Sequence, residues 1–305
     1  MSVELDKIVY IEMPGSNGQL IMALALIEAP EDVPPGFYDI DDVSTVQTIF
    51  DRRSFSKEVP DEDLTPEQID AVNHVEKFFA ERAAYQKRGL PHKRGIILTG
   101  KPGTGKTTVL KKIIADSVSK GRIVLQYNSP HELIRGVRDC RISSDIPVVV
   151  VYEDFDEVAV DHDVALTEVL DGVDAKVLDN FAFVVTTNYL DRIPDRLCNR
   201  PGRFDDIVAI PFPTEQSRRT IVNTISGGKI VDPDEIEFLV EHTANFPLAH
   251  MREIIIGKVL FGKTNSELLE MVAKFKRRLY GAPKKTWFQK LLLKFKKEND
   301  RGYDD

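Results

Sequence analysis

The feature that most constrains the fold of this 305-residue chain is the stretch Gly100-Lys101-Pro102-Gly103-Thr104-Gly105-Lys106-Thr107. It has the form G-x-x-x-x-G-K-T. The apolar run Ile96-Ile97-Leu98 precedes it, and residues 108–114 follow it with the composition of a helix. A glycine loop between a strand and a helix N-terminus predicts an anion site, because the glycines let backbone N–H groups close around phosphates.

The motif assigns a role to each of its side chains. Lys106 would reach the β- and γ-phosphates of a nucleotide, and the Thr107 hydroxyl would ligate Mg²⁺. Alone, such a loop indicates nucleotide binding without saying which reaction follows. The residues predicted to bind the nucleotide are Gly100, Pro102, Gly103, Thr104, Gly105, Lys106, Thr107 and Thr108.

Composition narrows the class of protein. With 42% apolar and 30% charged residues the chain is typical of a soluble globular protein, and its net charge of -8 argues against a chain that is basic throughout and coats nucleic acid. Cys140 and Cys198 lack metal-site spacing, which favours a reduced compartment. The apolar run at 20–27 is too short to cross a bilayer, and residues 1–6 lack a basic signal region. We therefore expect a cytoplasmic protein without a transmembrane segment.

Carboxylates follow the most strongly predicted strand. The β-branched run at 147–152 predicts a strand that is buried on both faces, as in a parallel sheet. It ends in Glu153-Asp154-Phe155-Asp156-Glu157. Beside a phosphate loop, one such carboxylate can hold the Mg²⁺ shell and the next can activate the attacking water.

From this point the chain resembles the AAA family of ATPases, whose acidic box usually reads Asp-Glu-x-Asp. Here the order is Glu153-Asp154-Phe155-Asp156, which resembles the box of the mitochondrial AAA branch that moves the Rieske iron–sulfur protein. The resemblance implies Glu153 as metal ligand, with Thr107, and Asp154 as catalytic base. A second register, with Asp156 and Glu157 in these roles, would restore the Asp-Glu order and is kept as an alternative.

Two further elements resemble the same family. Asn188 follows the apolar run at 181–187, where the family's sensor residue faces the γ-phosphate. The stretch Asn199-Arg200-Pro201-Gly202-Arg203-Phe204-Asp205 is similar to the family's R-P-G-R-F-D element. The resemblance implies that Arg200 and Arg203 act as arginine fingers on a neighbouring subunit's ATP. It therefore implies ATP and Mg²⁺ as cofactors and a homo-oligomeric ring, with a hexamer as the family expectation.

The fold class expected is α/β, with a five-stranded parallel P-loop sheet flanked by helices. We expect a small β-rich accessory domain and linker over 1–60, with a hairpin or meander near residues 8–11 and 20–26. The nucleotide-binding core is expected over 61–213 and a helical lid over 214–264. Basic amphipathic helices and an acidic tail would occupy 265–305. Helix starts are predicted at Thr65, Thr214 and Asp232, each with a capping side chain.

The favoured function is an ATP-hydrolysing ring ATPase that remodels or translocates a protein client. Segment 128–146 lacks an aromatic-apolar-Gly pore loop, and the chain lacks the protease motif His-Glu-x-x-His. The alternative is a nucleic-acid-associated ATPase, a loader or helicase accessory, because residues 271–297 carry ten Lys or Arg and no acid. A third, weaker alternative is a scaffold that binds ATP with little turnover. In the motif that resembles the lid's adenine contact, Leu248 stands where the family has Gly.

Overall fold

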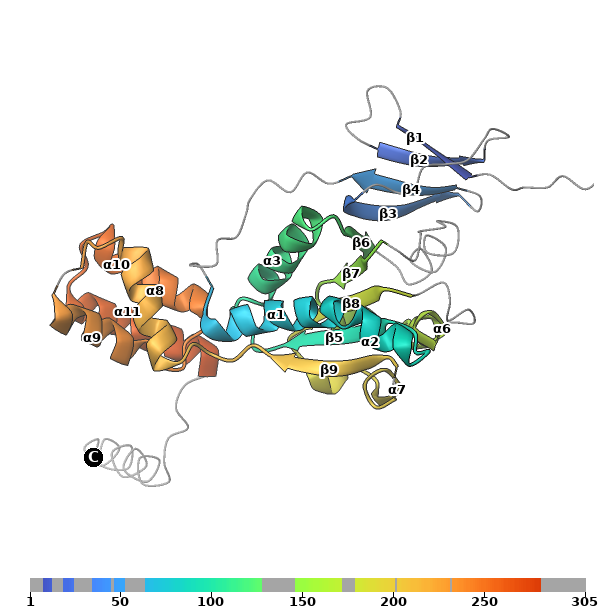
Figure 1. The fold of residues 1–305 in the computed structure, drawn as a ribbon. Helices are drawn as coiled ribbons and strands as arrows, with labels where there is room; N and C mark the ends of the chain where they lie inside the picture. The colour runs from blue at the N-terminus through green and yellow to red at the C-terminus, as the bar shows by residue number, and fades with distance from the viewer. Residues whose placement is uncertain are drawn as a thin grey trace, which may run out of the picture.

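The fold was analysed in a computed structural model that describes residues 8–12, 19–24, 35–44, 47–52, 64–127, 146–171, 179–200, 202–230 and 232–280. A twisted sheet flanked by helices forms one part of the molecule, and a group of four helices lies beside it (Figure 1). In Figure 1, α1 begins beside the group of helices and runs along the sheet, and the chain passes from the sheet into that group after β9.

All strands of the described residues belong to one nine-stranded sheet with the order β1-β2-β4-β3-β6-β7-β8-β5-β9. The P-loop strand β5 lies near one edge, between β8 and β9. The strands are β1 (Ile8–Glu12), β2 (Gln19–Leu24), β3 (Gly36–Ser44), β4 (Gln47–Arg52), β5 (Lys93–Thr99), β6 (Ile123–Tyr127), β7 (Val148–Tyr152), β8 (Phe181–Thr187) and β9 (Phe204–Ala209).

The parallel part of this sheet has six strands, where we expected five. The five expected strands are present as β6, β7, β8, β5 and β9. The sixth is β3, which pairs in parallel with β6 from Gly36↔Ile123 to Ile40↔Tyr127. The sequence hid this strand because Pro34-Pro35-Gly36 reads as a break and acids follow at 41–42. Tyr38 is nevertheless fully buried, and its burial stabilises the pairing.

The N-terminal strands extend the same sheet. The predicted hairpin is confirmed, because β1 pairs antiparallel with β2 in the register Ile8↔Leu24. β4 then joins β2 to β3 by antiparallel pairing on both sides. Antiparallel strands on the edge of a parallel sheet are a common arrangement. Strands β1–β4 therefore connect to the P-loop strands through backbone hydrogen bonds.

Alternating side chains bury both faces of the parallel strands. Ile96 and Leu98 of β5 pack on one face with α1 and α3, whereas Ile97 packs on the other face with residues 155–170. The β7 run Val148–Val151 is at most 1% exposed at every position, as its β-branched sequence predicted. A sheet covered on both sides holds its strand ends rigidly.

The helices begin where the capping signals predicted. Thr65 caps α1 and accepts from Gln68 N, Thr214 accepts from Ser217 N, and Asp232 accepts from Asp234 N. The helices are α1 (Pro66–Ala80), α2 (Arg82–Lys87), α3 (Lys106–Ser119), α5 (Asp156–Ala159), α6 (Asp163–Asp171), α7 (Asp195–Cys198), α8 (Glu215–Ser226), α9 (Pro233–His242), α10 (Leu248–Val259) and α11 (Asn265–Tyr280), with a short 3-10 turn η2 at Leu190–Arg192.

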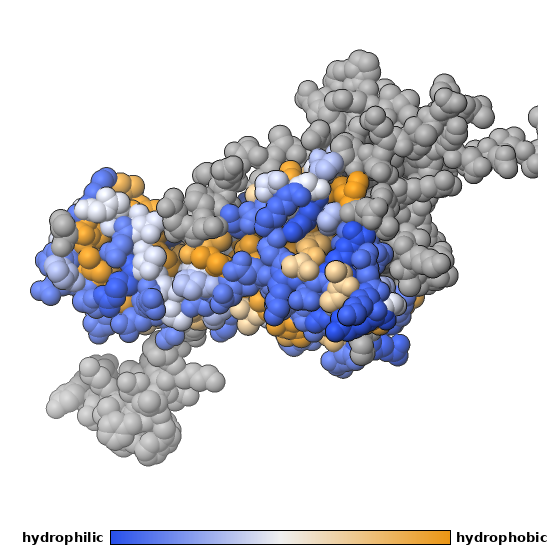
Figure 2. All heavy atoms as spheres, in the orientation of Figure 1, coloured by the Kyte–Doolittle hydropathy of each residue, from blue (hydrophilic) through white to orange (hydrophobic). Residues whose placement is uncertain are grey.

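Helices α8–α11 enclose a hydrophobic core of their own. Val222, Phe246, Met251, Ile255 and Leu268 are fully buried there. The face of the molecule seen in Figure 2 is mostly hydrophilic over the described residues, with apolar residues in small groups. Because this core is separate from the two clusters on the sheet, the helical group can change its orientation without opening the sheet.

None of the helices in the described residues is long and apolar enough to cross a membrane. Several sequence-based expectations lie outside these residues. They are the missing pore-loop motif at 128–145, Cys140, and the part of the basic amphipathic stretch and tail that follows residue 280.

Ion pairs fasten α1 and the sheet together. Arg94 on β5 donates to both carboxylate oxygens of Asp206 on β9, at 2.7 Å each, and His74 on α1 lies 2.9 Å from the same carboxylate. Two residues after His74 on the same helix, Glu76 accepts from Arg122 through both carboxylate oxygens, at 2.7 Å each. The hydrogen bond from Arg94 is the main cause that holds the pKa of Asp206 below its usual range.

We predict that Asp206→Asn lowers the free energy of unfolding by about 1–2 kcal/mol at neutral pH, because Arg94 loses a charged partner. The folded-state pKa of Asp206 is depressed, so this contribution is present above the ordinary aspartate pKa of about 3.9 and is lost as the pH falls further. Denaturant unfolding at several pH values measures the difference. Asp70→Asn, an exposed change on α1, is the control. An equal effect of both variants would contradict the prediction.

Candidate functional site

The predicted phosphate loop connects β5 to α3, as the sequence indicated. Gly103 and Gly105 have φ values of +79° and +97°, which L side chains rarely adopt. At Gly100, an added Cβ would lie 2.4 Å from the carbonyl oxygen of Ile210. Thr104 Oγ1 donates to Lys101 O at 2.9 Å and closes the turn. The glycines are therefore required by the backbone path of the loop.

Lys106, the first residue of α3, reaches back across the loop. Its Nζ donates to Gly100 O at 2.7 Å and to Lys101 O at 3.2 Å, and it donates to Asn188 Oδ1 at 2.6 Å. The side chain is buried, and this burial lowers the pKa of Lys106 against the opposing charges of Asp154 and Asp156. A cation held here can exchange carbonyl partners for phosphate oxygens.

The predicted acidic and polar residues meet this loop from two neighbouring strands. Glu153 follows β7 and accepts from the Thr107 hydroxyl, with Oε2 at 3.0 Å from Oγ1. Asn188 follows β8 and donates through Nδ2 to Asp154 Oδ1 at 3.1 Å. Thr107–Glu153 and Lys106–Asn188–Asp154 thus form two hydrogen-bonded sets at the carboxyl edge of the sheet. Both carboxylates are exposed, so a metal ion or a water could reach them.

Asp154 has an unusual backbone conformation. Its φ is +49°, in the left-handed region that a non-glycine residue rarely adopts. Its N–H donates to Thr186 Oγ1 at 3.1 Å, and the next residue, Phe155, donates to Thr186 O at 2.8 Å. Phe155 is fully buried and anchors the turn. The turn directs the carboxylate toward Asn188, and strain of this kind is concentrated at functional sites.

Asp156 lies apart from these two sets. It is 7% exposed and accepts from the Thr187 hydroxyl at 2.6 Å, and Arg192 Nη1 lies 3.9 Å away. Thr187 in turn accepts from the backbone N–H of Tyr189 at 3.0 Å. Asp156 therefore supports the turn that carries Asn188. This geometry favours the register with Glu153 and Asp154 facing the loop over the register with Asp156 and Glu157.

The two predicted finger arginines differ in their surroundings. Arg200 is exposed. Arg203 is 2% exposed, and its Nε donates to Asp171 Oδ1 at 2.7 Å while Nη2 donates to Oδ2 at 2.5 Å. Its Nη1 contacts Arg196 O. The bond to Asp171 raises the pKa of Arg203, and Arg203 lowers that of Asp171. Arg203 is held within its own chain, so the expectation that it reaches a neighbour does not fit this arrangement.

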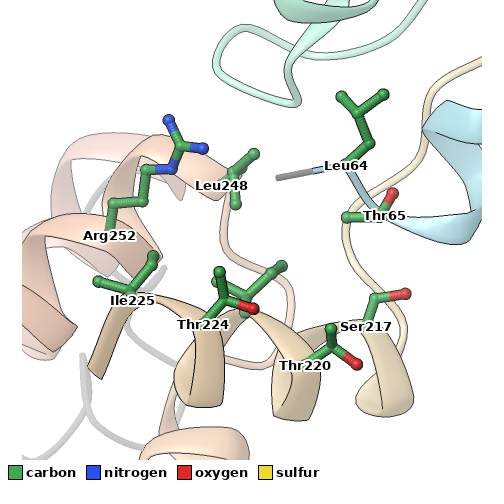
Figure 3. Close-up of a pocket in the computed structure, with 9 residues that line it drawn as sticks. Leu64, Thr65, Ser217, Thr220, Thr224, Ile225, Leu248 and Arg252 are labelled. Carbon is green, nitrogen blue, oxygen red and sulfur yellow. The ribbon is translucent and has the colours of Figure 1, made fainter. Parts of the chain in front are cut away.

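A pocket lies between the start of α1 and helices α8 and α10 (Figure 3). Leu64 and Thr65 face it from α1, and Leu248 and Arg252 face it from α10. The remaining lining residues come from α8: Ser217, Thr220, Ile221, Thr224 and Ile225. Pro247 adjoins the phosphate loop, because an added Cβ at Gly103 would lie 3.0 Å from its Cβ. Apolar side chains and hydroxyl groups thus line a small pocket near the phosphate loop.

Sequence reasoning missed a further contact of the phosphate loop. Gln68, in the first turn of α1, donates through Nε2 to Thr104 O at 2.9 Å. Glu67 accepts from Ser217 Oγ at 3.0 Å and so joins α1 to α8. The only signal in the sequence was Thr65 three residues before Gln68, which indicates a helix cap. It did not indicate contacts to the loop or to α8.

The residues of the two hydrogen-bonded sets lie within a stretch that matches a known protein family. Residues 96–212 match the ATPase family associated with various cellular activities (AAA). The ATP-dependent zinc metalloprotease FtsH 3 of Petrotoga mobilis is 25% identical over 223 residues, which cover 66% of this chain and 34% of the relative. The proteasome-activating nucleotidase of Methanothermobacter thermautotrophicus is 28% identical over 218 residues, covering 64% of this chain and 52% of the relative.

A plant relative gives a similar picture. The ATP-dependent zinc metalloprotease FTSH 7, chloroplastic, of Arabidopsis thaliana is 27% identical over 252 residues, which cover 72% of this chain and 30% of the relative. The chain thus matches between about a third and about half of the length of these relatives.

We predict that Asp154→Asn binds nucleotide with an affinity close to that of the unchanged chain but loses about 10²–10⁴-fold in turnover. Asparagine has the same shape and tolerates φ near +49°, yet it cannot accept a proton from water. Nucleotide titration and a phosphate-release assay measure the two quantities. Glu157→Gln, at an exposed acid of the other register, is the matched control. Turnover that survives in Asp154→Asn and fails in Glu157→Gln would reverse the assignment.

Proposed function

We propose that this chain is a ring ATPase that uses ATP with Mg²⁺ and couples ATP hydrolysis to the remodelling or translocation of a protein client. The match of residues 96–212 to the AAA family supports this proposal. The observation that carries the proposal is the pair of hydrogen-bonded sets, Thr107–Glu153 and Lys106–Asn188–Asp154. They bring a metal ligand, a phosphate-binding cation, a sensor and a carboxylate base to one edge of the sheet.

In the proposed reaction each group of this edge has one task. The loop amides and Lys106 hold the phosphates, and the Thr107 hydroxyl and Glu153 hold the Mg²⁺ shell. Asp154 accepts a proton from the attacking water, and Asn188 orients that water and the γ-phosphate. Asp154 is one methylene shorter than glutamate, so the attacking water would have to lie closer to the backbone, which is left-handed at Asp154 with φ of +49°. The Glu-Asp order resembles the box of the mitochondrial branch that moves the Rieske protein.

We place the adenine in the pocket between α1, α8 and α10 (Figure 3). Leu248 lies close to the loop, since an added Cβ at Gly105 would stand 3.7 Å from Leu248 Cδ2. A leucine in this position would contact the base by its side chain where the family's Gly allows closer approach. This placement supports a role for residues 214–264 as a lid over the nucleotide.

The ring is part of the proposal because the resemblance to the AAA family implies arginine fingers that act on a neighbouring subunit's ATP. Arg200 is exposed on the loop after α7, and its guanidinium fork matches the oxygens of a transferring phosphoryl group. We assign it as the finger that acts on the ATP of the neighbouring subunit. Arg203 instead fixes this loop to α6 through Asp171. A hexamer is the family expectation for the ring.

The client is proposed to be a protein. Two of the relatives described above are named as an ATP-dependent zinc metalloprotease and a proteasome-activating nucleotidase. Both names refer to protein degradation, which supports a protein as the client. The present sequence carries no His-Glu-x-x-His motif, so we assign it the ATPase part of such work. Strands β1–β4 continue the sheet that holds the site, and we propose that this N-terminal β-segment selects the client.

We predict that Arg200→Ala lowers ATP turnover by about 10³-fold or more while ATP binding persists, because the finger acts on the reaction rather than on binding. Mixing it with Lys106→Ala subunits should restore part of the activity. In the mixed ring, an intact loop on one subunit meets an intact Arg200 on its neighbour. Steady-state ATPase assays across mixing ratios measure the rescue.

The control for the mixing experiment is Arg219→Ala, an arginine that pairs with Glu237 on the surface of α8 and α9. Its turnover should be unchanged. If the ATPase activity of the mixtures equals the sum of the activities of the two variants measured separately, the ATP site is not shared between subunits.

We predict that Asp154→Asn, which binds ATP without hydrolysing it, retains its protein client when isolated with ATP. Lys106→Ala, which lacks the phosphate contact, should release the same protein. Affinity isolation followed by mass spectrometry, and nuclease treatment of the same samples, measure what is retained. Recovery of nucleic acid in place of a protein, lost on nuclease treatment, would favour the loader or helicase-accessory function.

A further inference from the structure

The first turn of α1 contacts the phosphate loop through a single buried side chain. Gln68 is 1% exposed. Its Oε1 accepts from the backbone N–H of Thr65 at 3.0 Å, and its Nε2 donates to Thr104 O at 2.9 Å. The amide therefore uses its acceptor within α1 and its donor on the loop. Both hydrogen bonds are shielded from water. In such a place a donor or acceptor left without a hydrogen-bond partner destabilises the fold.

The bond to Thr104 O sets the orientation of one peptide unit. In a planar trans peptide the C=O and the following N–H point in opposite directions. With the Thr104 carbonyl held against Gln68, the Gly105 N–H points away from α1. That direction leads to the concave side of the loop, where N–H groups receive phosphate oxygens.

The position of Gly105 shows how closely the amide is fitted. An added Cβ there would lie 2.2 Å from Gln68 Nε2. Its φ of +97° also exceeds the range of L side chains. A side chain at residue 105 would therefore collide with the amide of Gln68, so the glutamine at this position requires a glycine in the loop.

Helix capping alone does not account for a glutamine at this position. A capping box needs only an acceptor three residues after the Thr, and glutamate serves as well and favours the helix dipole. A donor is needed only for Thr104 O. The side chain that satisfies both partners is an amide, which carries one acceptor and one donor group.

We propose that Gln68 is a positioning residue of the ATP site, which holds the Thr104–Gly105 peptide in its phosphate-binding orientation from the first turn of α1. The inference rests on the proposed function. Through the same turn, Glu67 contacts Ser217 of α8, so loop and lid share one support. Gln68 itself contacts the loop backbone and acts on the nucleotide only through it.

The test compares Gln68→Glu with the unchanged chain by titration with a fluorescent ATP analogue. The introduced carboxylate still accepts from Thr65 N but faces Thr104 O as a second acceptor. We expect ATP affinity to fall about tenfold or more near pH 8. As the pH is lowered toward about 5, the carboxyl gains a proton, can donate to Thr104 O, and should recover affinity relative to the unchanged chain.

Gln216→Glu is the matched control, because it adds the same charge to an exposed position in the first turn of α8. Its affinity should follow that of the unchanged chain at every pH. Thermal unfolding checks that each variant is folded. Gln68→Met has a similar size without either hydrogen bond, and it should bind ATP weakly without the recovery in acid.

Two results would overturn the inference. One is a folded Gln68→Glu or Gln68→Met variant that binds ATP within twofold of the unchanged chain. The other is a loss in Gln68→Glu that is the same at all pH values. If Gln68→Glu does not fold, Gln68→Met decides on its own. An unchanged chain that fails to bind ATP would instead count against the proposed function, so the two failures are distinct.

Discussion

The hydrogen bond from Lys106 to Asn188 is the contact on which the rest of the site depends. It joins the first turn of α3 to the end of β8 at 2.6 Å, and Asn188 carries the connection to Asp154 at the end of β7. These two hydrogen bonds can form because β8 lies between β5 and β7 and is parallel to both, so that the carboxyl ends of the three strands share one edge of the sheet. Strand order and direction thus convert three separate loops into one constellation.

The loop is also supported from the opposite side. α1 contacts it through Gln68, and the group of helices α8–α11 approaches it at Pro247 and Leu248. Glu67 joins α1 to α8. A ligand that changes the loop can therefore affect α8 through α1, because the loop and α8 are both hydrogen-bonded to the first turn of α1. The separate core of α8–α11 allows that group to respond as a unit.

Several expectations differ from the structure for identifiable reasons. β3 was not recognised because a Pro-Pro-Gly break precedes it and acids interrupt its apolar alternation, yet parallel pairing with β6 and burial of Tyr38 stabilise it. Arg203 was grouped with Arg200 by motif, but Asp171, 32 positions earlier in the chain, holds it in the interior.

The local elements were determined by the sequence alone. Glycine spacing, β-branched runs and capping residues specify the P-loop, β5, β7 and the starts of α1, α8 and α9, because these depend on backbone preferences within a few residues. The tertiary structure decided which carboxylate faces the loop, which arginine is exposed, and that the amide of Gln68 supports Thr104. These contacts join residues far apart in the chain, and only the packed sheet and helices bring their side chains within hydrogen-bonding distance.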